Sequence, residues 1–211
     1  MIGYQLIIVW FLLFFSIFYP FVYKLNSINK TIAYWCYCMI FITIFEFMLI
    51  FYYKYMCKKG EEYYNENKCF GYEERNIKDM FSYKMYMDLY GDYSLSDSKY
   101  RMNIGKDGFH FVLFGEIWHG IFSGILAITS LYYLYIKEDS KELFLSIFTM
   151  GIIQLTMIIW YVSPVFLELF IEESNNHISK WWWAPFLWNV PWFIFPPIMI
   201  YHGAKNLLVC E

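Results

Sequence analysis

The chain has 211 residues, of which 59% are hydrophobic, 25% are aromatic and only 17% are charged. This composition excludes an ordinary soluble domain, in which about a quarter of the residues carry charge. The formal net charge of −3 lacks the basic excess that nucleic-acid binding needs. We therefore expect a single membrane domain with no nucleic-acid partner.

Five apolar segments are long enough to cross a bilayer, which takes about 20 residues in a helix. They are residues 2–23, 31–55, 109–136, 143–171 and 181–209. In hydrocarbon the backbone must satisfy its own hydrogen bonds, and these segments are too long and too little alternating for barrel strands. The sequence therefore predicts an all-α, polytopic membrane helical bundle with about five transmembrane helices.

The first segment has two interpretations, a removed signal peptide or a retained helix. Residues 2–23 have no basic leader and no small-residue cleavage site, so we favour the retained helix. The chain then divides into an N-terminal helix with a short loop, residues 1–30, and a four-helix membrane domain, residues 31–209.

The only long polar stretch, residues 54–107, has nearly balanced charges, so topology depends on the shorter connections. Residues 24–30 contain two lysines and no acid, whereas residues 172–180 contain two glutamates and one lysine. Because lysine and arginine favour the cytosolic side, we expect residues 24–30 and the C-terminus in the cytosol and the two other loops in the lumen. Trp181–Trp183 fit an aromatic belt at the lumenal interface.

Four polar side chains interrupt the apolar segments: Glu46, Glu116, Asn189 and, near a segment end, Glu168. An ionisable group there costs roughly 2.5–3.5 kcal/mol unless it faces a cavity or a partner. Glu46, Glu116 and Asn189 each lie eight or nine residues from the nearest lumenal charge. At 1.5 Å per residue they share a depth of about 12–14 Å, which predicts a site formed by three helices.

Two further residues join this predicted site by helical spacing. His119 follows Glu116 by three positions and Trp192 follows Asn189 by three, so each pair shares a helix face. A buried carboxylic acid keeps its proton and can donate it, and an indole face stabilises a cation. The group suits protonation of an apolar alkene and equally the binding of an amphiphilic amine. Taken singly, each residue also fits a packing role.

The cysteines show no metal-ligand spacing, and we expect neither a metal nor any other cofactor. Cys36 and Cys38 lie in an apolar segment and are interpreted as packing residues. Cys57 and Cys69 would form a disulfide if their loop faced an oxidising lumen, and they would otherwise be thiols.

Four prolines in the last segment indicate either a kink that lines a cavity or plain helix irregularity: Pro185, Pro191, Pro196 and Pro197.

Several motifs in residues 31–209 resemble the EXPERA-domain family, which includes the emopamil-binding sterol Δ8–Δ7 isomerases and the sigma-2 receptor. In chain order they are Phe41-Ile42-Thr43-Ile44-Phe45-Glu46 followed by Phe51-Tyr52-Tyr53, then Asp97-Ser98-Lys99-Tyr100 followed by Glu116 and Gly124, then Asn189-Val190-Pro191-Trp192 followed by Pro196. Each motif is weak alone, and their order and spacing make the resemblance more specific.

The resemblance implies a multi-pass protein of the endoplasmic reticulum membrane, with a cavity for a sterol or a cationic amphiphile. Glu46 and Glu116 would be the acid–base carboxylates, and Trp192 would lie against the developing cation. The substrate-binding residues would be Asn189, Trp192, Tyr100 and Asp97.

The chain departs from the family pattern at the acid–base site. Ile42 stands where the isomerases have a histidine, one turn before the first glutamate, and Ile158 stands where an aspartate is expected. Our hypothesis is that His119 supplies the missing imidazole from a neighbouring helix. Milder departures are Lys99 for arginine and Ile125 for proline.

Three other interpretations stay open at this point. The chain could be a catalytically silent member that binds sterol or lipid, which Ile42 favours. A small transporter would carry internally repeated helices, and none is visible. An assembly subunit or a homodimer would use a face of small residues, which Gly120 and Gly124 offer at a spacing of four.

Overall fold

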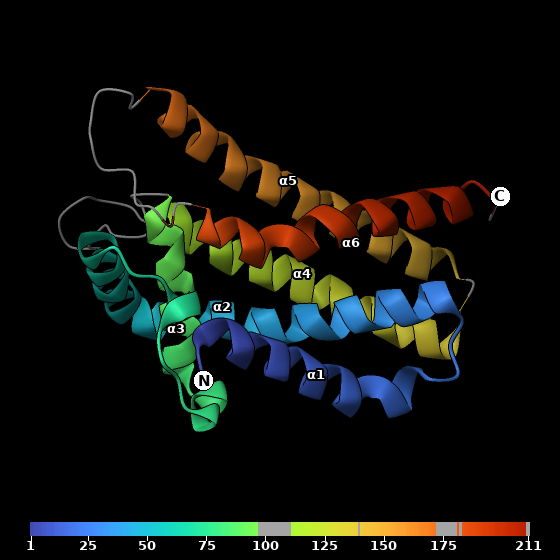
Figure 1. Ribbon diagram of the computed structural model, residues 1–211. Coiled ribbons are helices and arrows are strands. Elements are labelled where there is room, and N and C mark those ends of the chain that lie inside the picture. The colour runs from blue at the N-terminus through green and yellow to red at the C-terminus, as the bar shows by residue number, and fades with distance from the viewer. Residues whose placement is uncertain (97–110, 139, 172–180, 182, 210–211) are drawn as a thin grey trace.

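The computed structural model describes residues 1–96, 111–138, 140–171, 181 and 183–209, without the side chains of 111–112 and 164–171. These residues form an all-α bundle with no strand, as predicted. Five long helices run roughly in one direction (Figure 1): α1 (Gly3–Val22), α2 (Ser27–Glu66), α4 (Phe111–Ile136), α5 (Lys141–Ile171) and α6 (Ala184–Leu207). A shorter helix, α3 (Tyr83–Gly91), crosses one end of the bundle.

Four of the long helices are apolar enough to cross a membrane: α1, α2, residues 113–136 of α4 and residues 141–163 of α5. This agrees with a multi-pass membrane protein. The fifth, α6, has 24 residues and lies within the predicted segment 181–209, but it is not among these four. Its prolines, Asn189 and His202 lower its hydropathy, because proline, asparagine and histidine all transfer poorly to an apolar phase.

Helix α2 differs most from its predicted bounds, because it has 40 residues and runs 11 past the predicted end at residue 55. The Asn26 side chain accepts a hydrogen bond from the Asn29 N–H at 2.9 Å and fixes the start of the helix. Asn67, in the left-handed conformation with φ 55°, ends it. The first part of the expected polar loop is therefore helical.

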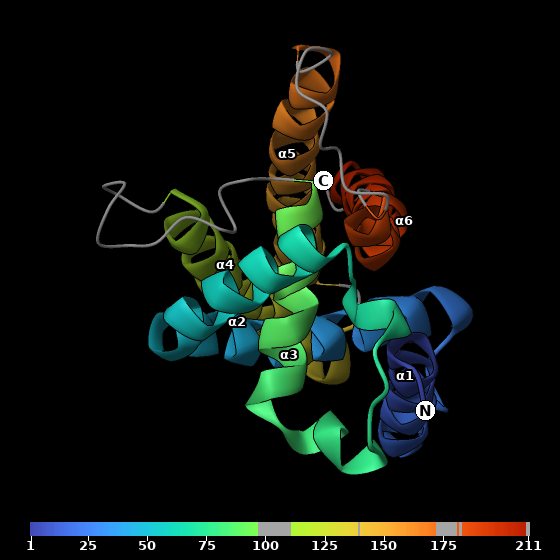
Figure 2. The ribbon, with the colours of Figure 1, turned by 60° about the vertical axis from the view of Figure 1, so that its left-hand side comes forward.

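The remainder of that stretch folds into a compact headpiece, residues 67–96, over one end of the bundle (Figure 2). It contains α3 and three short 3-10 helices: η1 (Phe70–Tyr72), η2 (Ile77–Phe81) and η3 (Asp92–Leu95). The start of α1 is tied to it, since the Gly3 N–H donates to the Glu73 carbonyl at 3.0 Å. Cys69 is a buried thiol in this headpiece, so the Cys57–Cys69 disulfide is not formed.

Asp92 joins the headpiece to the bundle. Its two carboxylate oxygens accept from the Phe70 backbone N–H at 2.7 Å and from the Trp188 indole N–H of α6 at 3.0 Å. The residue is fully buried, and burial raises the pKa of Asp92 to about 7, although the two N–H donors oppose that shift. The position of Trp188 therefore depends on a residue outside the spans.

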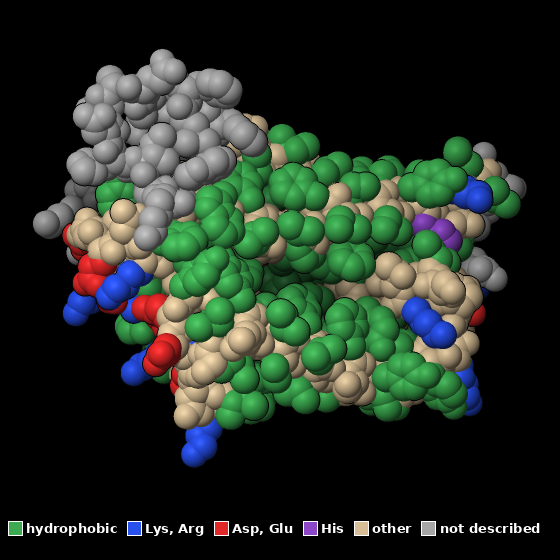
Figure 3. Space-filling model, viewed as in Figure 1, with side chains coloured by type: hydrophobic (Ala, Val, Ile, Leu, Met, Phe, Trp, Pro, Cys, Tyr) green, Lys and Arg blue, Asp and Glu red, His purple; other side chains and the backbone are tan. Residues whose placement is uncertain are grey.

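The ends of the bundle match the expected pairing of loops. At the end away from the headpiece, the Asn26 side chain donates to Glu138 at 3.3 Å, which joins the α1–α2 connection to the α4–α5 connection. The C-terminal end of α6 lies at this same end (Figure 1). The face of the bundle in Figure 3 is mostly apolar. Large apolar side chains such as Leu12, Ile17 and Ile128 are exposed on the helices. Lipid is the solvent that suits such a surface.

Candidate proton-transfer site and adjoining cavity

The two predicted carboxylates and the predicted histidine meet between α2 and α4. One donor atom from each of Glu46, Glu116 and His119 lies within 4.8 Å of the other two. The His119 Nδ1 atom lies 2.8 Å from the Glu46 Oε1 atom, and the side chains are only 6% and 2% exposed. The structure therefore brings together the two carboxylates that the shared depth predicts and the histidine that helical spacing adds to them. Their catalytic roles stay a prediction.

A small-residue contact holds Glu46 against α4. A Cβ atom at Gly120 would overlap the Glu46 Oε2 atom and lie 3.2 Å from the Glu46 Cβ atom, so a larger residue would displace the carboxylate from its present position. One turn away, the Thr43 hydroxyl donates to the Gly120 carbonyl at 3.0 Å, and a Cβ at Gly124 would lie 2.7 Å from that hydroxyl. The Gly120–Gly124 face is therefore filled by α2 of the same chain. The possible homodimer stays a prediction, and this face does not support it.

The hydrogen bonding of the pair is incomplete. Among the residues that the structure describes, the Glu46 Oε2 and His119 Nε2 atoms are buried without a hydrogen-bond partner. Buried polar atoms are normally paired, so such atoms call for a physical explanation. A shared proton that moves along the Glu46–His119 hydrogen bond would suit a site whose remaining lone pairs await a substrate or a water molecule.

The same three donors are close enough to hold a divalent cation such as Zn²⁺, which accepts histidine nitrogen and carboxylate oxygen. The 2.8 Å separation of Nδ1 and Oε1 is that of a direct hydrogen bond, which explains the contact without an ion. We therefore interpret the group as an acid–base pair, Glu46–His119, with Glu116 as its neighbour.

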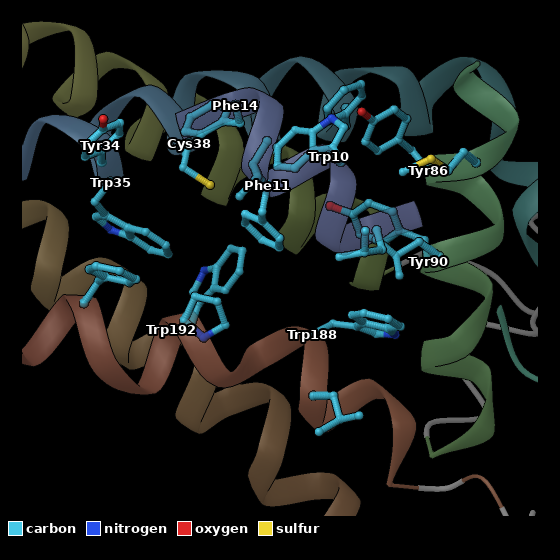
Figure 4. Close-up of a pocket in the computed structure, with 18 of the residues that line it drawn as sticks. Trp10, Phe11, Phe14, Tyr34, Trp35, Cys38, Tyr86, Tyr90, Trp188 and Trp192 are labelled. Atoms are coloured by element: carbon cyan, nitrogen blue, oxygen red, sulfur yellow. The ribbon is translucent and has the colours of Figure 1, made fainter. Parts of the chain in front are cut away.

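An apolar cavity of about 260 Å³ lies beside this pair, between α1, α2, α3 and α6 (Figure 4). Its walls are mainly aromatic and include Trp10, Trp35, Trp188, Trp192 and Tyr90. Figure 3 shows that the apolar surface is hollowed between α6 and α1, on the side where lipid would lie. A flat, apolar molecule that arrives from the membrane fits these walls.

The acid–base pair does not itself line the cavity. Ile42 and Phe45 of α2 are lining residues, whereas Glu46, Glu116 and His119 are not. Ile42 thus faces the cavity at the position where the family has its histidine, and the imidazole of His119 contacts the carboxylate from the α4 side. The carboxylates therefore do not open directly into the hollow, because α2 turns them toward α4.

Asn189 is placed near the site by a headpiece residue that the sequence reasoning missed. The Tyr93 hydroxyl of η3 donates to the Asn189 Oδ1 atom at 3.4 Å, and the Asn189 amide donates to the Pro185 carbonyl at 2.9 Å. Tyr93 and Tyr90 both line the cavity. Nothing in the sequence distinguishes these two tyrosines from the 19 others.

Trp192 does not share the level of the carboxylates. It lines the cavity with its ring centroid 5.2 Å from that of Trp35. Trp35 precedes Glu46 by 11 residues on α2, which is about 16 Å of helix. The indole therefore belongs to the far part of the cavity, where the Trp35 N–H donates to Gln154 at 2.8 Å. Its predicted role against a developing cation stays a prediction, although its ring lies nearer to Trp35 than the shared face with Asn189 suggests.

Three other predicted positions cannot be placed. Asp97 and Tyr100 lie outside the described residues, and so does the side chain of Glu168.

Comparisons of the chain with protein-family models, with curated proteins and with solved structures find no match. The resemblance to the EXPERA-domain family therefore stays a prediction from the motifs.

Proposed function

We propose that this chain is a membrane-embedded isomerase of the sterol Δ8–Δ7 type, which moves a ring double bond by adding one proton and removing another. The observation that supports it is the 2.8 Å contact between His119 and Glu46, buried beside an aromatic cavity that suits a flat apolar molecule. By the family resemblance, the protein would act in the endoplasmic reticulum membrane.

The proposed reaction needs an acid and a base of similar strength close together. A proton from the Glu46–His119 pair would form a new C–H bond at one alkene carbon and leave a carbocation on the other. A carboxylate, Glu116 or the newly deprotonated Glu46, would then remove a proton from the neighbouring carbon. The double bond forms one position along, and the protein regains its starting proton count.

The His119 contact also supports the hypothesis that this chain replaces the family histidine. In the family pattern the imidazole stands one turn before the glutamate on the same helix, where this chain has Ile42. Here an imidazole reaches the same carboxylate from α4. The chemical pair is the same, although the helix that supplies the nitrogen differs.

The decisive experiment replaces His119 with glutamine in protein reconstituted in lipid nanodiscs, with conversion of a Δ8 sterol to the Δ7 product as the readout. We expect His119→Gln to lower turnover by about 100-fold or more while sterol binding changes little, because glutamine can still bond to Glu46 but cannot carry a proton. His202→Gln, a half-buried histidine on α6 away from the site, is the matched control. Turnover unchanged in His119→Gln would reject the assignment.

A second candidate is a non-catalytic receptor for a sterol or a cationic amphiphile. It is favoured by the absence of the carboxylates and His119 from the residues that line the cavity. An aromatic enclosure alone is enough to bind a sterol ring system or, through ring faces, an ammonium group. Tight binding by the native protein without any conversion, and without complementation of yeast that lacks its Δ8–Δ7 isomerase, would favour this candidate.

A further inference from the structure

Four tyrosines line the cavity, and three of their hydroxyls already have a partner: those of Tyr34, Tyr86 and Tyr93. Two of the three donate to backbone carbonyls, at 3.2 and 3.5 Å, and the third donates to the Asn189 side chain at 3.4 Å. The fourth, Tyr90, makes no hydrogen bond to any residue that the structure describes. Its O–H donor and its lone pairs are therefore open to a molecule in the cavity.

The side chain of Tyr90 points into the cavity from the C-terminal end of α3. In Figure 4 its ring extends from α3 toward the space between Trp10 and Trp188. The ring stacks on Tyr93 with centroids 5.8 Å apart, which limits the directions that the hydroxyl can take. A fixed hydroxyl on a mainly apolar wall is a specific place for one polar group of a ligand.

A free sterol has one polar group of this kind, the 3-hydroxyl, at one end of a rigid and otherwise apolar ring system. Moving that hydroxyl from the membrane surface into an apolar cavity is unfavourable unless it forms a hydrogen bond there. The Tyr90 hydroxyl can both donate to an alcohol and accept from it. An esterified sterol has lost its O–H donor and carries a long acyl chain, so we expect the site to favour the free alcohol.

The position of Tyr90 also determines which way a sterol lies. Tyr86, one turn before Tyr90, stacks on Phe45 with ring centroids 3.4 Å apart. Phe45 precedes Glu46, so α3 meets the cavity wall at the level of the acid–base pair. Trp35 lies ten residues before Phe45 on α2, about 15 Å away along the helix. A sterol hydroxyl at Tyr90 therefore leaves the rings beside Phe45 and directs the apolar side chain toward Trp35.

We propose that the Tyr90 hydroxyl binds the 3-hydroxyl of a free sterol, and that this hydrogen bond orients the substrate in the cavity. The proposal rests on the proposed function, because it takes a sterol as the ligand. It concerns binding alone and adds no step to the proton transfer. The cavity therefore distinguishes a free hydroxysterol from a sterol ester or a hydrocarbon of the same shape.

A matched control residue lies outside the cavity. Tyr52 of α2 is a half-buried tyrosine that does not line the cavity, and its ring stacks on Tyr83 with centroids 3.8 Å apart. Tyr90→Phe and Tyr52→Phe each remove one hydroxyl and keep the ring. A 3-deoxysterol provides the second control, because it has the same rings and side chain without the 3-hydroxyl and so reports changes in the shape of the cavity.

The test measures the affinity of a 3-hydroxy Δ8 sterol and of its 3-deoxy counterpart for the native protein and both variants in the same lipid nanodiscs. We expect the native protein and Tyr52→Phe to bind the hydroxysterol about tenfold more tightly than the deoxysterol. Tyr90→Phe should lose this preference, with its affinity for the deoxysterol within about threefold of the native value. A preference that survives in Tyr90→Phe would overturn the proposal. An equal loss of affinity for both sterols would also overturn it, because that result reports altered packing.

The outcomes separate this inference from the function on which it rests. Conversion by the native protein, with the preference for the hydroxysterol kept in Tyr90→Phe, would leave the isomerase standing and remove Tyr90 as the hydroxyl-binding residue. A preference lost in Tyr90→Phe, without conversion by the native protein, would support the role of Tyr90 and favour the non-catalytic receptor. A native protein that binds neither sterol would overturn both.

Discussion

The polar cluster and the aromatic cavity lie on neighbouring faces of α2 and differ in how they are built. The cluster is closed, because Gly120 lets α4 press against Glu46 and Thr43 bonds across the contact. The cavity is open space of about 260 Å³ between bulky rings that pack on each other and leave a hollow. One face therefore fixes chemical groups to within a hydrogen-bond length, whereas the other provides volume and little directed polarity.

This difference assigns separate tasks to the two faces. Close packing excludes water and holds a proton donor and acceptor in register, which acid–base chemistry requires. Aromatic walls accept a flat apolar molecule with few polar constraints. Changes to the cluster should therefore remove conversion and spare binding, and changes to the cavity should weaken binding and spare the chemical groups.

The largest effect is expected at the shared proton. Glu46→Gln keeps the shape and can bond to His119, but it cannot donate or accept a proton under working conditions. We expect turnover to fall by about 1,000-fold or more, with sterol affinity within about threefold. The measurement is conversion of a Δ8 sterol alongside a binding isotherm for each protein. A Glu46→Gln protein that still converts sterol at the native rate would contradict the division of tasks.

A substitution at Gly120 should disrupt the packing of the cluster while it keeps the side chains of Glu46 and His119 themselves. The new Cβ of Gly120→Ala would overlap the Glu46 Oε2 atom, so we expect a loss of about 1–3 kcal/mol in stability together with lost turnover. Gly115→Ala on the same helix is the control, because its Cβ would meet Met157 at an ordinary 3.6 Å. Thermal unfolding in detergent compares the two, and equal stabilities would show that α2 and α4 are less tightly packed than described.

The complementary change fills the cavity. Cys38 lines it, so phenylalanine at this position should occupy the space and weaken sterol binding by about tenfold or more, while Cys38→Ala should bind nearly as the native protein does. Binding isotherms for both variants, with unfolding midpoints as a check on folding, give the comparison. If Cys38→Phe bound sterol normally, the ligand would lie elsewhere.

The smallest effect concerns the headpiece that orients Trp188 at the cavity wall. Since burial raises the pKa of Asp92 from 3.8 to about 7, the folded protein holds this proton more tightly than the unfolded chain does. Its contribution to stability is therefore present at low pH and is lost as the pH rises through that window. We expect the thermal unfolding midpoint to decrease as the pH rises from 4 to 8. In Asp92→Asn we expect a weaker dependence of this midpoint on pH. If the unfolding midpoint depended on pH equally in the native protein and in Asp92→Asn, Asp92 would not be the source of that dependence.

The sequence predicts the cluster better than the cavity, for a physical reason. Glu46 and Glu116 are conspicuous because charge is costly in apolar segments, and counting residues from the interface is enough to give them a common level. His119 follows from helical spacing. The glycine contact that closes the cluster is also present in the sequence, but it equally fits contact with a second copy of the chain.

The aromatic walls cannot be recognised in the same way. A ring that faces a hollow, such as Trp188, has the same local pattern as one that faces lipid or core, because all three surroundings are apolar. Tyr90 and Tyr93 lie in a stretch that reads as a polar loop, and only the headpiece fold brings them to the cavity. The level of Trp192 is mispredicted because the helix face says nothing about the direction in which a long side chain extends.

The central claim is that the Glu46–His119 pair exchanges protons with a molecule in the cavity, and solvent deuterium tests it most directly. Native protein in nanodiscs is incubated in D₂O with a Δ8 sterol, and the products are analysed by mass spectrometry, with Glu46→Gln in parallel. We predict Δ7 product that has gained a single deuterium with the native protein, and unlabelled, unconverted sterol with Glu46→Gln. Sterol that is bound by the native protein but neither converted nor labelled would contradict the account.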